Sequence, residues 1–123
     1  MMSKVLRFEM QVPDPESVIQ FYTAAFNWEF TKFSGPQDYW FIKTGSNDEQ
    51  GIDGGLLRSP DGAARTINSI EVTSIDDYLA SIASNGGTIV VPKISMPGMG
   101  YLAYFTDPSG MIVGVSQADS NAK

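Results

Sequence analysis

The chain contains neither cysteine nor histidine. Without cysteine it can form no disulfide, and it offers no thiolate as a nucleophile or metal ligand. Without histidine it lacks the usual acid–base group near neutral pH and the commonest ligand of transition metals. Serine triads are therefore excluded. A metal would have to rely on carboxylates, which suit magnesium or calcium better than zinc or iron.

Long apolar runs and clustered positive charges are also missing. The longest apolar segments, such as residues 89–91, fall far short of the roughly 20 residues that span a bilayer. No signal peptide is visible, so we expect a cytoplasmic protein with no membrane partner. The 8 basic residues are scattered among 14 acidic ones, giving a net charge of -6. We therefore expect no nucleic-acid partner.

An internal repeat organises the sequence. A length of 123 residues with 42% hydrophobic and 18% charged residues suits one globular domain. Within it, an alternating segment at residues 8–12 leads to a helix-capping residue, Asp14, and then to apolar residues at helical spacing. The same pattern recurs sixty positions later, at residues 68–72 and Ser74. We therefore predict two modules, at about residues 4–60 and 64–117.

Each module is predicted to follow the order β-α-β-β-β, from hydrophobic periodicity and turn residues. The strands expected in the first module are residues 5–12, 28–33, 38–44 and 52–58, with a helix from Pro15 to about Asn27. Those of the second are residues 66–73, 88–91, 101–106 and 111–117, with a helix from Ser74 to about Ser84. Residues 92–100 are expected to form a loop and residues 118–123 a frayed tail.

The predicted fold class is α+β. Each module would form a curved four-stranded sheet with one helix on its outer face. Two such sheets, related by pseudo-symmetry, would leave a half-barrel cleft of the kind that binds small molecules.

This arrangement resembles the vicinal-oxygen-chelate superfamily, which includes glyoxalase I, bleomycin and fosfomycin resistance proteins and extradiol dioxygenases. The resemblance rests on a series of short sequence motifs, namely Val12-x-Asp14-Pro15, Phe21-Tyr22, Phe26-x-Trp28, Asn85-Gly86-Gly87, Pro97-Gly98-Met99-Gly100-Tyr101, Asp107-Pro108-x-Gly110 and Gly114. It covers roughly residues 4–117 and is strongest to a glyoxalase-like subgroup whose members mostly lack an assigned reaction.

The resemblance implies a divalent metal held by four His, Glu or Gln side chains on the first and last strands of the modules. Carried over residue by residue, those positions fall on Arg7, Ile67, Gly114, and either Gly54 or Gly55. Arginine has no lone pair to offer a metal, and the other residues have no donor side chain. We therefore expect no metal and no other cofactor.

The residues expected to line the cleft share the inward face of the first strand of each module. Arg7, Glu9 and Gln11 alternate on one strand, and Ser69 and Glu71 on the other. Arg7 either pairs with Glu9 or replaces the metal charge and anchors an anionic ligand group. Glu9 and Glu71 are weaker candidates for a catalytic carboxylate pair.

Aromatic and methionine side chains complete the candidate ligand-binding set. Trp40 and Tyr104 lie on strands that could turn an aromatic face to the cleft. Met99 lies in the predicted loop and could form a pliable apolar lid.

Two functional hypotheses follow from this set. One is a metal-free binding protein for a small molecule, as the bleomycin-resistance proteins of this superfamily are. The other is a glyoxalase- or dioxygenase-like enzyme, acting as a lyase or oxidoreductase, either metal-free through Glu9 and Glu71 or with displaced metal ligands. The superfamily resemblance also leads us to expect a homodimer.

Overall fold

The computed structural model describes residues 2–123, which form eight β-strands and two α-helices in the order β-α-β-β-β repeated twice. The predicted α+β class is confirmed. The chain divides into two compact units: residues 7–67 form one, and the segment ending at Leu6 together with residues 68–123 forms the other. Neither helix in this described part of the chain is long and apolar enough to cross a membrane.

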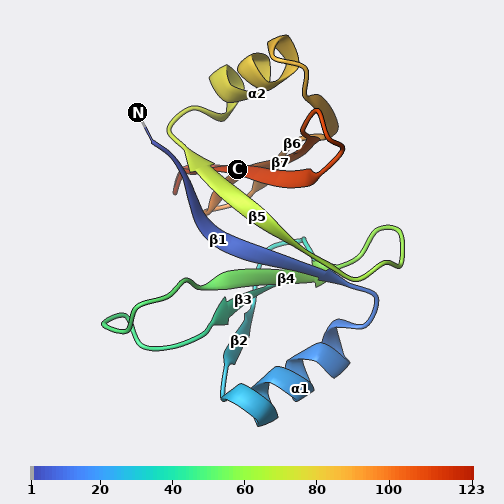
Figure 1. The fold of residues 1–123 in the computed structure, drawn as a ribbon. Coiled ribbons are helices and arrows are strands. Elements are labelled where there is room, and N and C mark those ends of the chain that lie inside the picture. The colour runs from blue at the N-terminus through green and yellow to red at the C-terminus, as the bar shows by residue number, and fades with distance from the viewer. Residues whose placement is uncertain (1) are drawn as a thin grey trace. The chain divides into compact units, whose positions relative to one another are not determined.

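The first unit is built on a four-stranded sheet with one helix (Figure 1). Its elements are β1 (Ser3–Val12, which begins in the other unit), α1 (Pro15–Phe26), β2 (Glu29–Lys32), β3 (Tyr39–Lys43) and β4 (Gly54–Arg58). β1 pairs parallel with β4, and the pairs β4–β3 and β3–β2 are antiparallel.

Local sequence signals explain where α1 begins and ends. The Asp14 side chain accepts a hydrogen bond from the Ser17 amide at 3.5 Å, and Pro15 occupies the first helical turn. Asn27 ends the helix in the left-handed conformation, with a φ of 61°. One side of α1 covers a core cluster formed by Val12, Ile42 and Leu56, which are buried.

The second unit repeats the plan. Its elements are β5 (Arg65–Val72, which begins in the first unit), α2 (Ile75–Ser84), β6 (Thr88–Met96), β7 (Gly100–Thr106) and β8 (Ile112–Ala118). β5 pairs parallel with β8, and β8–β7 and β7–β6 are antiparallel. Ser74 caps α2 by accepting from the Asp77 amide at 3.4 Å. Val72, Ala103 and Val115 form the core beneath the helix.

Two sequence predictions were wrong, the end of β6 and the frayed tail, and both lie in the second unit. β6 continues through Pro92 to Met96, where the sequence had predicted a loop from residue 92. Proline is tolerated because β6 is the last strand of the sheet order and its register shifts between Ile89 and Ile94.

The predicted frayed tail is ordered instead. The Asp119 amide donates to the Met99 carbonyl at 2.9 Å, and the Gly98 amide donates to the Ala122 carbonyl at 2.9 Å. The Ser95 hydroxyl donates to the Lys123 carbonyl at 2.7 Å. The tail therefore satisfies polar backbone groups of the β6–β7 turn, and it buries the small side chain of Ala122.

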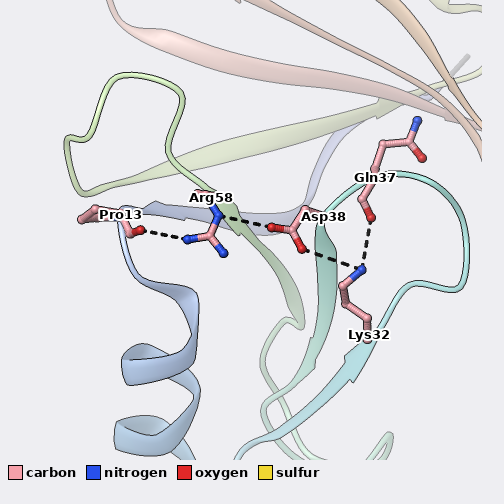
Figure 2. A network of polar contacts seen from close by, with 5 residues as sticks. All are labelled: Pro13, Lys32, Gln37, Asp38 and Arg58. Carbon is pink, nitrogen blue, oxygen red and sulfur yellow. Dashed lines mark hydrogen bonds and ion pairs between the residues drawn. The ribbon is translucent and has the colours of Figure 1, made fainter.

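A polar network joins the ends of the strands on the surface of the first unit (Figure 2). Asp38 accepts from Arg58 Nε at 3.3 Å and lies 3.8 Å from Lys32 Nζ. Arg58 also donates to the Pro13 carbonyl, and Lys32 to the Gln37 carbonyl. Because the charged side chains are about half exposed, these ion pairs contribute little to stability.

Candidate functional site

The polar candidates of β1 lie on the face of the strand that points away from α1. Phe8 and Met10 alternate with them and pack against the core cluster under the helix. Glu9 is only 2% exposed and Gln11 only 5% exposed. Buried polar groups are costly unless they are hydrogen-bonded, so the partners of these two side chains indicate what the face can do.

Glu9 is held by a tyrosine from β3. The Tyr39 hydroxyl lies 3.3 Å from Glu9 Oε2 and donates to it. Burial raises the pKa of Tyr39 far above its usual value, the negative charge of Glu9 raises it further, and the positive charge of Arg7 opposes both. The phenol therefore stays neutral at physiological pH, and Arg7 lies close enough to act on the same hydroxyl.

A glycine on β4 makes room for this tyrosine. Gly55 is the register partner of Glu9 on one side and of Phe41 on the other. A Cβ built at Gly55 would collide with the Tyr39 hydroxyl, so the space of the missing side chain is filled by the phenol. Gly54 lies opposite Phe8, on the helix side. Of the two glycines, Gly55 is therefore the one on the face of Glu9.

Gln11 is oriented by Arg65, which also forms an ion pair with Asp61. Arg65 donates to Gln11 Oε1 at 2.8 Å and to Asp61 at 2.6 Å. The hydrogen bond from Arg65, with those from Ser59 and the Ala63 amide, holds the pKa of Asp61 well below its usual range. Because the Gln11 carbonyl oxygen is bound by Arg65, the amide NH2 of Gln11 points elsewhere, as a hydrogen-bond donor.

The second unit has strand positions paired in the same way, and different residues occupy them. Ser69 on β5 is 2% exposed and is the register partner of Gly114 on β8. Gly114 is in turn the partner of Tyr104 on β7, whose ring would lie 3.4 Å from a Cβ at Gly114. Glu71 is the partner of Ser116 and shares the face of Ser69. The set Glu9–Gly55–Phe41 in the first unit thus corresponds to Ser69–Gly114–Tyr104 in the second.

Two of the predicted ligand-binding residues lie apart from these sets. Trp40 pairs with Leu56 and packs in the core cluster under α1, with Lys32 5.3 Å from its ring. It therefore lies on the face opposite Glu9, because successive side chains alternate along a strand. Met99 lies in the turn between β6 and β7 and is 41% exposed.

Sequence reasoning missed Tyr39 and Arg65. Tyr39 is the first of three consecutive aromatic residues on β3, so the sequence alone did not show which of them faces Glu9; the packing of Trp40 against the core under α1 does. Arg65 lies 54 positions from Gln11 in the chain. No local pattern signals a contact of that kind.

The residues present do not fit a metal ion. At Gly55 the space for a donor side chain is filled by Tyr39, and at Gly114 no side chain exists. Arg7 brings a positive charge that would oppose a cation. Nowhere among residues 2–123 do three or more acidic side chains gather as a metal site would require.

Comparison with known proteins places this fold in a family. The family model described as the Glyoxalase/Bleomycin resistance protein/Dioxygenase superfamily matches residues 4–115. The chain belongs to this superfamily. The predicted resemblance is therefore confirmed.

Individual relatives are distant. The chain is 22% identical to CFP32 of Mycobacterium tuberculosis, provisionally named a glyoxylase, over 90% of this chain and 44% of that protein. It thus spans less than half the length of the curated relatives it matches. The Mn(II)-bound glyoxalase of Novosphingobium aromaticivorans superimposes with a TM-score of 0.64 at 21% identity, over 98% of this chain and 41% of that one.

A further solved structure matches over its whole length. It is a variant of the methylmalonyl-CoA epimerase of Streptomyces coelicolor in complex with 2-nitronate-propionyl-CoA. The TM-score is 0.69 at 12% identity, over 100% of this chain and 99% of that one. At such low identities the similarity establishes a common fold and no common activity.

Proposed function

We propose that this chain is a small-molecule-binding protein of the glyoxalase/bleomycin-resistance type that works without the superfamily metal, in the cytoplasm. The observation that carries the proposal is the Glu9–Tyr39 pair beside Arg7, with Tyr39 filling the space at Gly55. Arg7 and Gly55 are positions to which the superfamily resemblance would assign metal ligands, and the polar cluster around them supports a site that works without a metal.

The chemistry of this face favours a ligand with an anionic or strongly polar group. Arg7 supplies a permanent positive charge that can bind a carboxylate with two hydrogen bonds. Gln11 offers an amide NH2 because Arg65 holds its oxygen. Phe41, in edge contact with Tyr39 at 5.5 Å between ring centroids, adds an apolar surface to the same face. An acyl thioester or a fatty carboxylate combines these properties.

Isothermal titration calorimetry with two probes tests the proposal. The probes are 2-nitronate-propionyl-CoA, which a structural relative binds, and decanoate, a simple carboxylate amphiphile. We expect at least one to bind, and Arg7→Met to weaken that binding by about 2 kcal/mol, the scale of a charge-assisted hydrogen bond. Arg58→Met is the matched control, because Arg58 lies in the exposed network of Figure 2.

The same variants separate a binding role for Arg7 from a structural one. If Arg7 serves only to compensate Glu9, Arg7→Met will lower the melting temperature and leave the affinity for the probe unchanged. That result would refute Arg7 as a ligand anchor. Failure of both probes to bind the unaltered protein would count against the proposed ligand class.

A metal-free enzyme is a second candidate, favoured by the contact between Glu9 and a neutral phenol. A carboxylate beside a proton donor can act as a general base when it reaches an acidic C–H of a ligand. The test is NMR of methylmalonyl-CoA in D2O with protein treated with a chelator. Loss of the α-proton signal that Glu9→Gln abolishes would favour the enzyme over the binding protein.

A further inference from the structure

A cavity of about 420 Å³ opens in the first unit where β2 begins and β3 ends. Three segments of that unit form its walls. They are the end of α1, the facing strand positions Glu29 and Lys43, and the β3–β4 loop through residues 44–46 and Glu49. None of the polar residues around Glu9 lines this cavity. It is therefore distinct from the ligand site proposed above.

Phe26 gives the cavity an apolar wall that is already held in place. It lies seven positions after Ile19, which packs on the core cluster under α1. Its ring contacts Tyr22 at 5.9 Å and Trp28 at 6.0 Å, measured between ring centroids. The Phe26 side chain is nevertheless 62% exposed and borders the cavity. A ring that is fixed by its neighbours loses little conformational entropy when a ligand covers the rest of it.

Two carboxylates border the same cavity. Glu29 stands opposite Lys43 in the β2–β3 pairing, but Lys43 Nζ donates to Asn47 Oδ1 at 2.8 Å instead. Glu29 forms no ion pair with any of residues 2–123. Glu49 accepts from the amide and the hydroxyl of Ser46 at 2.8 and 2.9 Å, and these bonds lower the pKa of its carboxyl group. Glu49 therefore keeps its negative charge at neutral pH.

The rest of the loop makes the surroundings of the cavity more acidic. Residues 44–53 include Asp48, Glu49 and Asp53 and no basic residue. These groups do not form a metal site, because in the described part of the chain no three acidic side chains lie close enough to hold an ion. A negative field beside an aromatic ring favours an organic cation, which can pair with carboxylates and also contact the face of the ring.

We propose that this cavity binds an organic ammonium ion with a flat apolar body. The body covers Phe26, and the ammonium group pairs with Glu29 and Glu49. The proposal is independent of the function proposed above, because the two sites share no residue and favour ligand groups of opposite charge.

Two probes with the same ring system and opposite charges test the proposal. They are tryptamine, a cation, and indole-3-acetate, an anion. In an NMR titration of the 15N-labelled chain, we expect tryptamine to shift the amide signals of Gly45, Ser46 and Glu49. Indole-3-acetate should shift them far less, because the carboxylates repel it. No shift of these three signals by tryptamine, or equal shifts by both probes, would overturn the proposal.

Substitutions at the cavity assign the two parts of the ligand. Glu29→Gln should weaken tryptamine binding about fivefold or more, since it removes a charge from the ammonium site. Glu16→Gln is the matched control, because it removes the same charge from an exposed position in the first turn of α1. Its affinity for tryptamine should stay at that of the unaltered chain. Equal affinities in the two variants would refute a role for Glu29.

Phe26→Leu tests the aromatic wall while keeping an apolar side chain against Trp28. We expect tryptamine to bind this variant about threefold or more weakly, because a leucine offers no ring face to a cation. Melting curves should show that each variant is folded under the conditions of the titration. An unchanged affinity in folded Phe26→Leu would show that the ring is not part of the site. Binding of decanoate near Glu9 is unaffected by any of these outcomes, so the two proposals fail separately.

Discussion

At the residue scale, the two strand glycines that face Glu9 and Ser69 differ sharply in the space around them. A Cβ at Gly55 would strike the Tyr39 hydroxyl, whereas a Cβ at Gly114 would lie 3.4 Å from the Tyr104 ring, near ordinary contact. We predict that Gly55→Ala lowers the free energy of unfolding by about 3 kcal/mol, because the added methyl group overpacks the site and breaks the hydrogen bond from Tyr39 to Glu9. Urea denaturation measures the change.

Gly114→Ala is the matched control for that substitution. It makes the same chemical change at the corresponding register position, and we expect it to cost less than about 1 kcal/mol. Equal losses in the two variants would show that the strands, and not the Tyr39–Glu9 contact, account for the sensitivity of Gly55.

Tyr39 also gives a prediction about alkaline pH. Burial raises the pKa of its hydroxyl in the folded chain, with a further contribution from Glu9, while an unfolded tyrosine ionises near pH 10. As pH rises through 10, the unfolded chain loses this proton first, so the free energy of unfolding falls. Tyr39→Phe should make that alkaline decline shallower. Melting curves between about pH 8 and pH 11 would disprove the effect if the two proteins declined in parallel.

The sequence predicts part of the candidate site at this scale. Strand alternation correctly grouped Glu9 with Gln11 because their neighbours Phe8 and Met10 are apolar. It could not give the partners of these side chains, because the contacts to Tyr39 and Arg65 join residues 30 and 54 positions away. The sequence also does not determine which face of β3 each of its three consecutive aromatic side chains occupies, since each of them can be buried on either face.

At the scale of elements, the ordered tail gives a prediction about the β6–β7 turn. The Gly98 amide donates to the Ala122 carbonyl, and the Gly110 amide donates within its own turn to the Asp107 carbonyl at 2.9 Å. Removal of residues 119–123 should therefore speed hydrogen exchange at Gly98 and leave Gly110 unchanged. NMR exchange measurements on both proteins check this. An unchanged exchange rate at Gly98 would mean that the turn is stable without the hydrogen bonds to the tail.

Helices are the elements that the sequence predicts best. Asp14 and Ser74 signal the two helix starts through side chains that cap the first turn. The end of β6 was missed because Pro92 reads as a break, and only the edge position of the strand makes it acceptable. The tail was missed because its stability comes from one distant turn and not from any pattern of its own.

At the scale of the whole molecule, the order of strands and helices identifies the fold more clearly than any single site residue identifies the function. Two copies of β-α-β-β-β follow from the repeat alone, and the superfamily match over residues 4–115 agrees with them. Function is less well determined, because the same fold is found in an Mn(II)-bound glyoxalase and in a CoA-thioester epimerase. What distinguishes this chain is which side chains occupy the register positions of its strands.

Those side chains lead to a prediction about metal content. Arg7 is a cation, Gly55 and Gly114 provide no donor, and Tyr39 fills the space at Gly55. The chain purified without an affinity tag should therefore contain far less than one transition-metal ion per molecule by elemental analysis. Added Mn2+ should leave its melting temperature unchanged, because only an ion that binds the folded state raises stability. One manganese, nickel, zinc or iron ion per chain that survives dialysis would show that the metal ligands lie elsewhere in the sequence, and it would restore a metal-dependent enzyme as the leading function.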